Sequence, residues 1–128
     1  MGNVIIWADI PVVDLPRAMK FYGHVTGQEV MQFPGMDGVA VIGNPTASGD
    51  TAMVSADLYT GGKPSKDGAT IYLNPNRDID GLLDRVVEAG GEIDRPKAYM
   101  GEMVGWIATF FDTEGNRIGV QQPGDAPE

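Results

Sequence analysis

Trp7 and Asp9 are the residues of this chain whose types and spacing are best suited to act together on a ligand. They lie two positions apart in the apolar run 4–10, so in a β-strand their side chains share one face, and the even-numbered residues form an apolar second face. A carboxylate beside an indole can act as a base or can anchor a hydroxyl or amine of a ligand. Alternatively, neighbouring hydroxyls and amides satisfy the carboxylate of Asp9, and the sequence leaves both interpretations open.

Further candidate residues of this mixed apolar and polar kind lie on other predicted strands. Small-molecule pockets combine apolar or aromatic walls with a few polar groups, although core packing explains the apolar members about as well. The predicted ligand contacts are Trp7, Asp9, Met53, Ser55, Thr70, Tyr72, Asn74, Trp106 and Gln121. Glu102 is a second candidate acid or base, in a glycine- and methionine-rich segment, 99–105, that is either a mobile rim or a plain loop.

Composition and charge exclude several classes of partner and site. The chain has 128 residues and a net charge of −9, and its 9 lysines and arginines are scattered, so we expect neither a nucleic acid nor a membrane partner. Without cysteine it has no disulfide, thiolate nucleophile or sulfur zinc site, and the only histidine, His24, is expected to be a solvated helix residue. No apolar run is long enough to span a bilayer and no signal peptide is evident, so the expected location is the cytoplasm.

Hydrophobic periodicity predicts the elements that position these residues. Asp14 begins a helix that ends at Gly27, and Asp78 begins a second helix that ends at Gly90–Gly91. Strands are predicted over residues 4–10, 29–33, 39–42, 51–58, 69–74, 92–98, 104–111 and 117–122.

The two halves of the chain form an internal repeat, because Asp78 and Gly91 each lie 64 positions after Asp14 and Gly27. We therefore predict one α+β domain of two βαβββ modules, about 3–59 and 68–122, followed by a disordered tail over 123–128. A Gly-, Pro- and Ser-rich connector joins the modules. Neither module can bury its sheet alone, so the two mixed sheets are expected to pair around a shared cavity.

Three groups of motifs resemble the vicinal oxygen chelate superfamily, which includes glyoxalase I, bleomycin-resistance proteins and extradiol dioxygenases. The first group combines residues 12–14 with Phe21–Tyr22, and the second combines residues 72–74 with 78–80. The third combines residues 90–91, 105–106 and Asp112–Gly119. The resemblance covers nearly the whole chain. It implies the fold of paired βαβββ modules and says little about the reaction.

Members of this superfamily usually hold a divalent metal with His, Glu or Gln on the first and last strands of each module. The resemblance places the four ligand positions at Trp7, Ser55, Thr70 and Gly119. None of these residues is a usual ligand for a divalent ion, so we expect no metal and no cofactor.

The resulting hypothesis is a homodimeric, metal-free protein that binds a small organic molecule, similar to the drug-sequestering members of the superfamily. The alternative is a lyase, isomerase or dioxygenase-like enzyme, with Asp9 as base or with an atypical metal site. A third possibility is an interaction module whose sheets serve mainly to dimerise, and such a module needs no cavity of ligand size.

Overall fold

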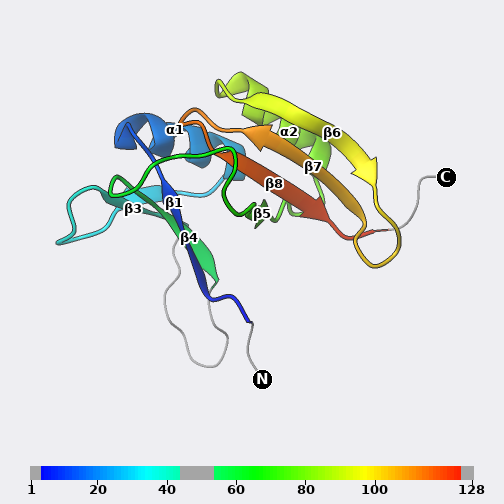
Figure 1. Cartoon of the computed structure of the whole chain (residues 1–128), viewed down its shortest axis with the longest axis horizontal. Helices are drawn as coiled ribbons and strands as arrows, with labels where there is room; N and C mark the ends of the chain where they lie inside the picture. Colours follow the sequence, from blue (N-terminus) through cyan, green and yellow to red (C-terminus); the bar gives the residue numbers. More distant parts are fainter. Residues whose placement is uncertain (1–3, 44–53, 125–128) are drawn as a thin grey trace.

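Two four-stranded mixed sheets, each associated with one helix, make up the computed structural model, which describes residues 4–43 and 54–124 (Figure 1). Sheet A has the strand order β1 (Trp7–Pro11), β4 (Ser55–Tyr59), β3 (Val39–Ile42), β2 (Val30–Gln32), and its helix is α1 (Leu15–Thr26). Sheet B has the order β5 (Tyr72–Leu73), β8 (Arg117–Gln122), β7 (Trp106–Phe111), β6 (Glu92–Tyr99), and its helix is α2 (Ile79–Glu88).

Each sheet repeats the same topology. The first strand of each unit runs parallel to the last strand of that unit, and the other pairs are antiparallel. The predicted α+β fold of two βαβββ modules is therefore confirmed. Met53 and the predicted tail beyond Gly124 lie outside the described residues.

Both helices begin at the predicted caps but end in different ways. The Asp14 carboxylate accepts a hydrogen bond from the Arg17 N–H at 3.1 Å, and Gly27 ends α1 with a φ of +69°. After α2, Gly90 has the positive φ, whereas a Cβ added to Gly91 would lie 2.8 Å from the Phe111 carbonyl oxygen. Gly90 is therefore needed for its positive φ, and Gly91 is needed because a side chain there would collide with neighbouring atoms.

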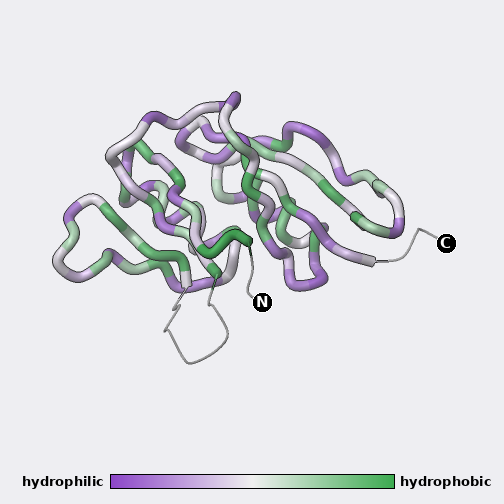
Figure 2. The backbone as a smooth tube through the Cα atoms, turned by 60° about the horizontal axis from the view of Figure 1, so that its bottom comes forward, coloured by the Kyte–Doolittle hydropathy of each residue, from purple (hydrophilic) through white to green (hydrophobic). Residues whose placement is uncertain are grey.

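Several strands differ from their predicted ranges. β1 begins at Trp7, and the exposed apolar residues 4–6, green beside the N-terminus in Figure 2, precede it. β5 contains two residues rather than six. β6 continues past Pro96 because it is an edge strand whose pairing with β7 shifts on both sides of Arg95.

The core lies between the sheets and the helices, and α1 also packs against α2. Its largest fully buried aromatic side chains are Tyr22 and Phe21 of α1 and Phe110 of β7. Phe21 packs edge to face against Tyr22, with ring centroids 5.0 Å apart, and in a tilted arrangement against Phe110, with centroids 6.1 Å apart. One core therefore spans both modules. Neither helix in the described part of the chain has the length and hydropathy to cross a membrane.

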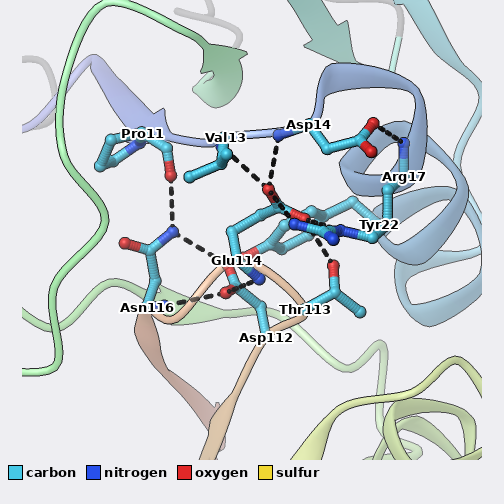
Figure 3. Close-up of polar contacts among 9 residues, drawn as sticks. All are labelled: Pro11, Val13, Asp14, Arg17, Tyr22, Asp112, Thr113, Glu114 and Asn116. Atoms are coloured by element: carbon cyan, nitrogen blue, oxygen red, sulfur yellow. Dashed lines mark hydrogen bonds and ion pairs between the residues drawn. The ribbon is translucent and has the colours of Figure 1, made fainter.

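The turn 112–116 joins the second module to the start of α1 (Figure 3). Glu114 Oε1 accepts hydrogen bonds from the N–H groups of Val13 and Asp14, both at 2.8 Å, and its Oε2 accepts one from Arg17 Nε at 2.7 Å. Burial alone would raise the pKa of Glu114, but these hydrogen bonds outweigh it and lower the pKa to about 2. The Glu114 carboxylate is therefore charged and fully engaged in holding the modules together.

Two further side chains of this turn bond to the first module. The Tyr22 hydroxyl donates to Asp112 Oδ2 at 2.5 Å, and Asn116 Nδ2 donates to the Pro11 carbonyl oxygen at 2.7 Å. Burial, followed by the nearby charge of Asp112, raises the pKa of Tyr22 well above its usual value. The motif at 112–116 that carries much of the family resemblance thus has a structural role in this chain.

Candidate functional site

The open face of sheet A brings Trp7 and Asp9 of β1 next to two residues of β4. The parallel register pairs Trp7 with Ser55 and Asp9 with Asp57, so these four side chains share the face opposite to α1. The indole Nε1 of Trp7 donates a hydrogen bond to Asp57 Oδ2 at 2.9 Å. An indole and two carboxylates therefore form a continuous group on this face.

Asp57 is the most perturbed acid of the group. Burial raises its pKa, the hydrogen bond from Trp7 opposes this rise, and the neighbouring Asp9 carboxylate raises the pKa further. Its Oδ2 accepts the Trp7 hydrogen bond, but its Oδ1 is buried and has no hydrogen-bond partner among residues 4–43 and 54–124. None of the four ion pairs found in that part of the chain involves Asp9 or Asp57.

Asp57 is absent from the sequence-predicted candidates, and its role depends on strand pairing. The alternation over 51–58 places it on the same face as Ser55, but nothing local says that this face adjoins Asp9. The βαβββ topology carries that signal, because it makes the first and last strands of a module parallel neighbours. When the strands over 4–10 and 51–58 are paired in parallel, Asp9 and Asp57 can lie side by side.

The remaining candidates on sheet B do not form one group. Tyr72 lies beside Gly119 on the open face, and Gln121 shares that face, its Nε2 donating to the Val104 carbonyl oxygen at 3.0 Å. Trp106 lies on the other face, toward the core, with its ring 5.4 Å from that of Tyr99. The structure therefore separates Trp106 from the two residues with which it was predicted to line a cavity.

The polar candidates near β5 and in the β6–β7 connection lie apart from the sheet A group. Thr70 precedes β5, and the Asn74 side chain accepts a hydrogen bond from the Asn76 N–H at 2.9 Å. Glu102 is exposed in the turn between β6 and β7. Ser55 belongs to the sheet A face, but its hydroxyl donates to the Ile42 carbonyl oxygen at 2.6 Å. These side chains add no free polar group beside Trp7.

The residues at the four metal positions implied by the resemblance do not fit a divalent ion. Trp7 offers no lone pair, and Ser55 and Thr70 offer only neutral hydroxyls, of which that of Ser55 donates its proton to the Ile42 carbonyl oxygen. At Gly119 an added Cβ would lie 2.5 Å from the Tyr72 ring, so that ring fills the space a longer side chain would need. Within residues 4–43 and 54–124, no group of three or more His, Cys, Asp or Glu side chains could hold a metal ion.

His24 lies away from both open sheet faces. Its Nε2 is 2.8 Å from Glu88 Oε1, so it joins the two helices. It borders a hollow of about 490 Å³ whose other lining residues are Arg17, Lys20, Phe21, Glu88 and Ala89. This histidine therefore bridges the modules and has no contact with the carboxylate pair.

Curated relatives resemble this chain over most of its length. The "Putative glyoxylase CFP32" of Mycobacterium tuberculosis and of Mycobacterium bovis are each 27% identical over 119 residues, which is 91% of this chain. The chain spans 44% of the length of these relatives.

Solved structures share the fold at low sequence identity. A hypothetical protein, SA1046 from S. aureus, is 24% identical with a TM-score of 0.65, covering 94% of this chain and 98% of its own. A glyoxalase/bleomycin resistance protein from Albidiferax ferrireducens is 17% identical with a TM-score of 0.73, covering 94% and 100%. The fosfomycin resistance protein FosX from Listeria monocytogenes, in a mutant complexed with Mn(II) and 1S,2S-dihydroxypropylphosphonic acid, is 13% identical with a TM-score of 0.64, covering 97% and 93%.

The family model matches residues 4–120, which include every strand and helix except the last two residues of β8. The sequence motifs, the two βαβββ modules and this match agree with one another. The chain belongs to the Glyoxalase/Bleomycin resistance protein/Dioxygenase superfamily.

Proposed function

We propose that this protein binds a small organic molecule on the open face of sheet A and does so without a metal. One observation carries the proposal: Trp7 and Asp57 share a hydrogen bond on that face, and Asp9 lies beside them. The half-exposed indole offers a flat apolar surface, and the two carboxylates offer polar anchors. The residues at the implied metal positions provide no ligand set that would suggest metal-dependent chemistry instead.

Tryptophan fluorescence tests the placement, because Trp7 and Trp106 are the two tryptophans of the chain. In a Trp106→Phe variant, all tryptophan emission comes from Trp7, and a ligand on sheet A is expected to quench it. Trp7→Ala is expected to weaken binding about tenfold by calorimetry, since it removes the apolar contact. Unchanged affinity of Trp7→Ala would count against this site.

The second candidate function is an enzyme of the same superfamily in which Asp9 acts as a base. The raised pKa of Asp57 next to the exposed Asp9 favours it, because paired carboxylates can hold and release a proton. Asp9→Asn should then abolish turnover while leaving the thermal unfolding temperature unchanged. A fully active Asp9→Asn variant would remove Asp9 from any mechanism.

We also propose that the protein is a homodimer. Each helix covers one face of its sheet, and apolar residues before β1 are strongly exposed, namely Val4 at 97%, Ile5 at 64% and Ile6 at 61%. Light scattering coupled to gel filtration is expected to give twice the 13.6 kDa mass of the chain. A monomer at micromolar concentration would refute the dimer and would leave the ligand proposal untouched.

A further inference from the structure

We propose that the hollow between α1 and α2 is a second ligand site and that it binds a small organic phosphate. The hollow lies apart from the open face of sheet A, so this inference is independent of the proposed function. Three observations support it: the size of the hollow and its place between the modules, the basic residues that line it from α1, and the apolar wall beside them.

The hollow has the size of a small-molecule pocket. Its volume is about 490 Å³, and pockets for small ligands have volumes of roughly 300–1,000 Å³. One wall comes from α1, and the other comes from Glu88 and Ala89 at the C-terminal end of α2. Because α1 belongs to the first module and α2 to the second, a ligand in this hollow would contact both modules.

Basic side chains predominate in the α1 wall. Arg17, Lys20 and His24 are spaced by three and four residues, so they share one face of the helix. They gather there although the chain has only 9 lysines and arginines, a single histidine and a net charge of −9. The equivalent positions 64 residues later, in α2, contain no basic residue. The fold that the two modules share therefore does not itself require this basic cluster.

Each of the three basic residues keeps a nitrogen for a ligand. Arg17 bonds to Glu114 through Nε and Nη2, which fixes the guanidinium and leaves Nη1 outside those bonds (Figure 3). Lys20 takes part in no ion pair within the described part of the chain. The Nε2 of His24 contacts Glu88, which leaves Nδ1 outside that contact. The chain thus does not use the full binding capacity of these residues.

The other lining residues leave room for an organic anion. Among the described residues that line the hollow, Glu88 is the only acid, and His24 already lies 2.8 Å from its Oε1. Phe21 and Ala89 are apolar and provide a surface on which an organic group can pack. The hollow therefore combines an excess of basic groups with an apolar wall.

The basic cluster favours a phosphate over a carboxylate. A phosphate group has three strong acceptor oxygens and a charge of about −1.5 to −2 at pH 7, whereas a carboxylate has two oxygens and a single charge. Arginine binds phosphate through paired N–H groups, and lysine binds it as a point charge. Three basic residues around one hollow thus match a phosphate, and the rest of the volume accommodates its organic group.

Calorimetry with phenyl phosphate, benzoate and benzyl alcohol at neutral pH tests the inference. We expect phenyl phosphate to bind about tenfold more tightly than benzoate, and benzyl alcohol to bind most weakly. Lys20→Gln is expected to weaken phenyl phosphate binding about tenfold, because it removes a charged donor. Glu88→Gln is expected to strengthen it about threefold, because it removes the opposing charge. Both side chains are exposed, so neither substitution disturbs the core.

Arg77→Gln is the matched control. Arg77 is exposed, precedes α2 at the end opposite to Glu88, and forms no ion pair in the described part of the chain. Its substitution changes the net charge by the same amount as Lys20→Gln and should leave phenyl phosphate affinity within about twofold of the parent protein. Trp7→Ala should likewise leave this affinity unchanged, because Trp7 belongs to sheet A and does not line the hollow.

Several outcomes would overturn the inference. Unchanged affinity of Lys20→Gln, an Arg77→Gln effect as large as that of Lys20→Gln, or no phenyl phosphate binding at millimolar concentration would each refute the site. Weaker binding by Glu88→Gln would refute the assigned role of charge, and benzoate binding as tight as that of phenyl phosphate would refute the phosphate. If Trp7→Ala abolishes phenyl phosphate binding, the ligand lies on sheet A; the hollow is then refuted and the proposed function stands.

Discussion

Replacing Glu114 with glutamine measures how strongly the turn 112–116 stabilises the joined modules. The pKa of Glu114 is about 2 instead of 4.5, and each pKa unit corresponds to about 1.4 kcal/mol, so folding favours the charged carboxylate by about 3 kcal/mol. The Glu114 side chain is 0% exposed, but that of Arg17 is 49% exposed, and solvent screens its share of the interaction. We expect Glu114→Gln to lower the free energy of unfolding by about 2–3 kcal/mol.

The pH dependence of this loss follows from the sign of the pKa shift. Because the folded pKa lies below the unfolded value, the carboxylate contributes its full stability above about pH 4.5 and loses it as the pH falls toward about 2. Glutamine does not titrate in this range. The difference in unfolding free energy between the parent protein and Glu114→Gln should therefore be constant near neutral pH and shrink in acid.

Urea denaturation followed by circular dichroism at neutral and acidic pH measures both quantities. Asp80→Asn is the control, because the ion pair of Asp80 with Lys97 has a similar distance of 2.9 Å but its acid is 73% exposed. We expect Asp80→Asn to change the unfolding free energy by less than about 0.5 kcal/mol. A Glu114→Gln effect as small as this one, or one independent of pH, would refute the role assigned to Glu114.

Three further predictions concern packing, backbone and metal content. Tyr22→Phe should cost about 1–3 kcal/mol in urea denaturation, because buried Asp112 loses its hydroxyl donor, and an unchanged midpoint would contradict this. Gly27→Ala should cost about 1 kcal/mol through its positive φ alone, whereas Gly91→Ala should cost more because its Cβ would collide with neighbouring atoms. Equal losses for the two glycine variants would contradict that distinction. Protein purified without chelator or affinity tag should contain no stoichiometric zinc, nickel, manganese or iron by mass spectrometry, and near-stoichiometric metal would favour the metal-dependent enzyme.

The helices and the module order could be predicted because their signals are local. Asp14 and Asp78 each cap the helix that follows, and both caps are confirmed, because each carboxylate accepts a hydrogen bond from the N–H three residues later. A cap, an apolar stripe and a terminal glycine lie within one short segment, so no knowledge of the rest of the chain is needed. The spacing of 64 residues then reveals the repeat.

One part of the candidate site could not be predicted because it depends on contacts between distant segments. Trp7 and Asp9 share a face by alternation alone, but Asp57 joins them only through a register between strands about 50 residues apart. The separation of Trp106 from Tyr72 has a different cause. The strand 106–111 reads WIATFF and is apolar on both faces, so alternation does not indicate which face meets the core.

The contact between His24 and Glu88 joins equivalent positions of the two modules. These residues lie 64 positions apart, the same spacing that separates the two helix caps, so each meets its own counterpart in the other module. In a pair of identical first modules, His24 would face a second His24, and in a pair of identical second modules two Glu88 carboxylates would repel each other. The histidine and carboxylate at this point therefore favour the union of two unlike modules over the self-association of either.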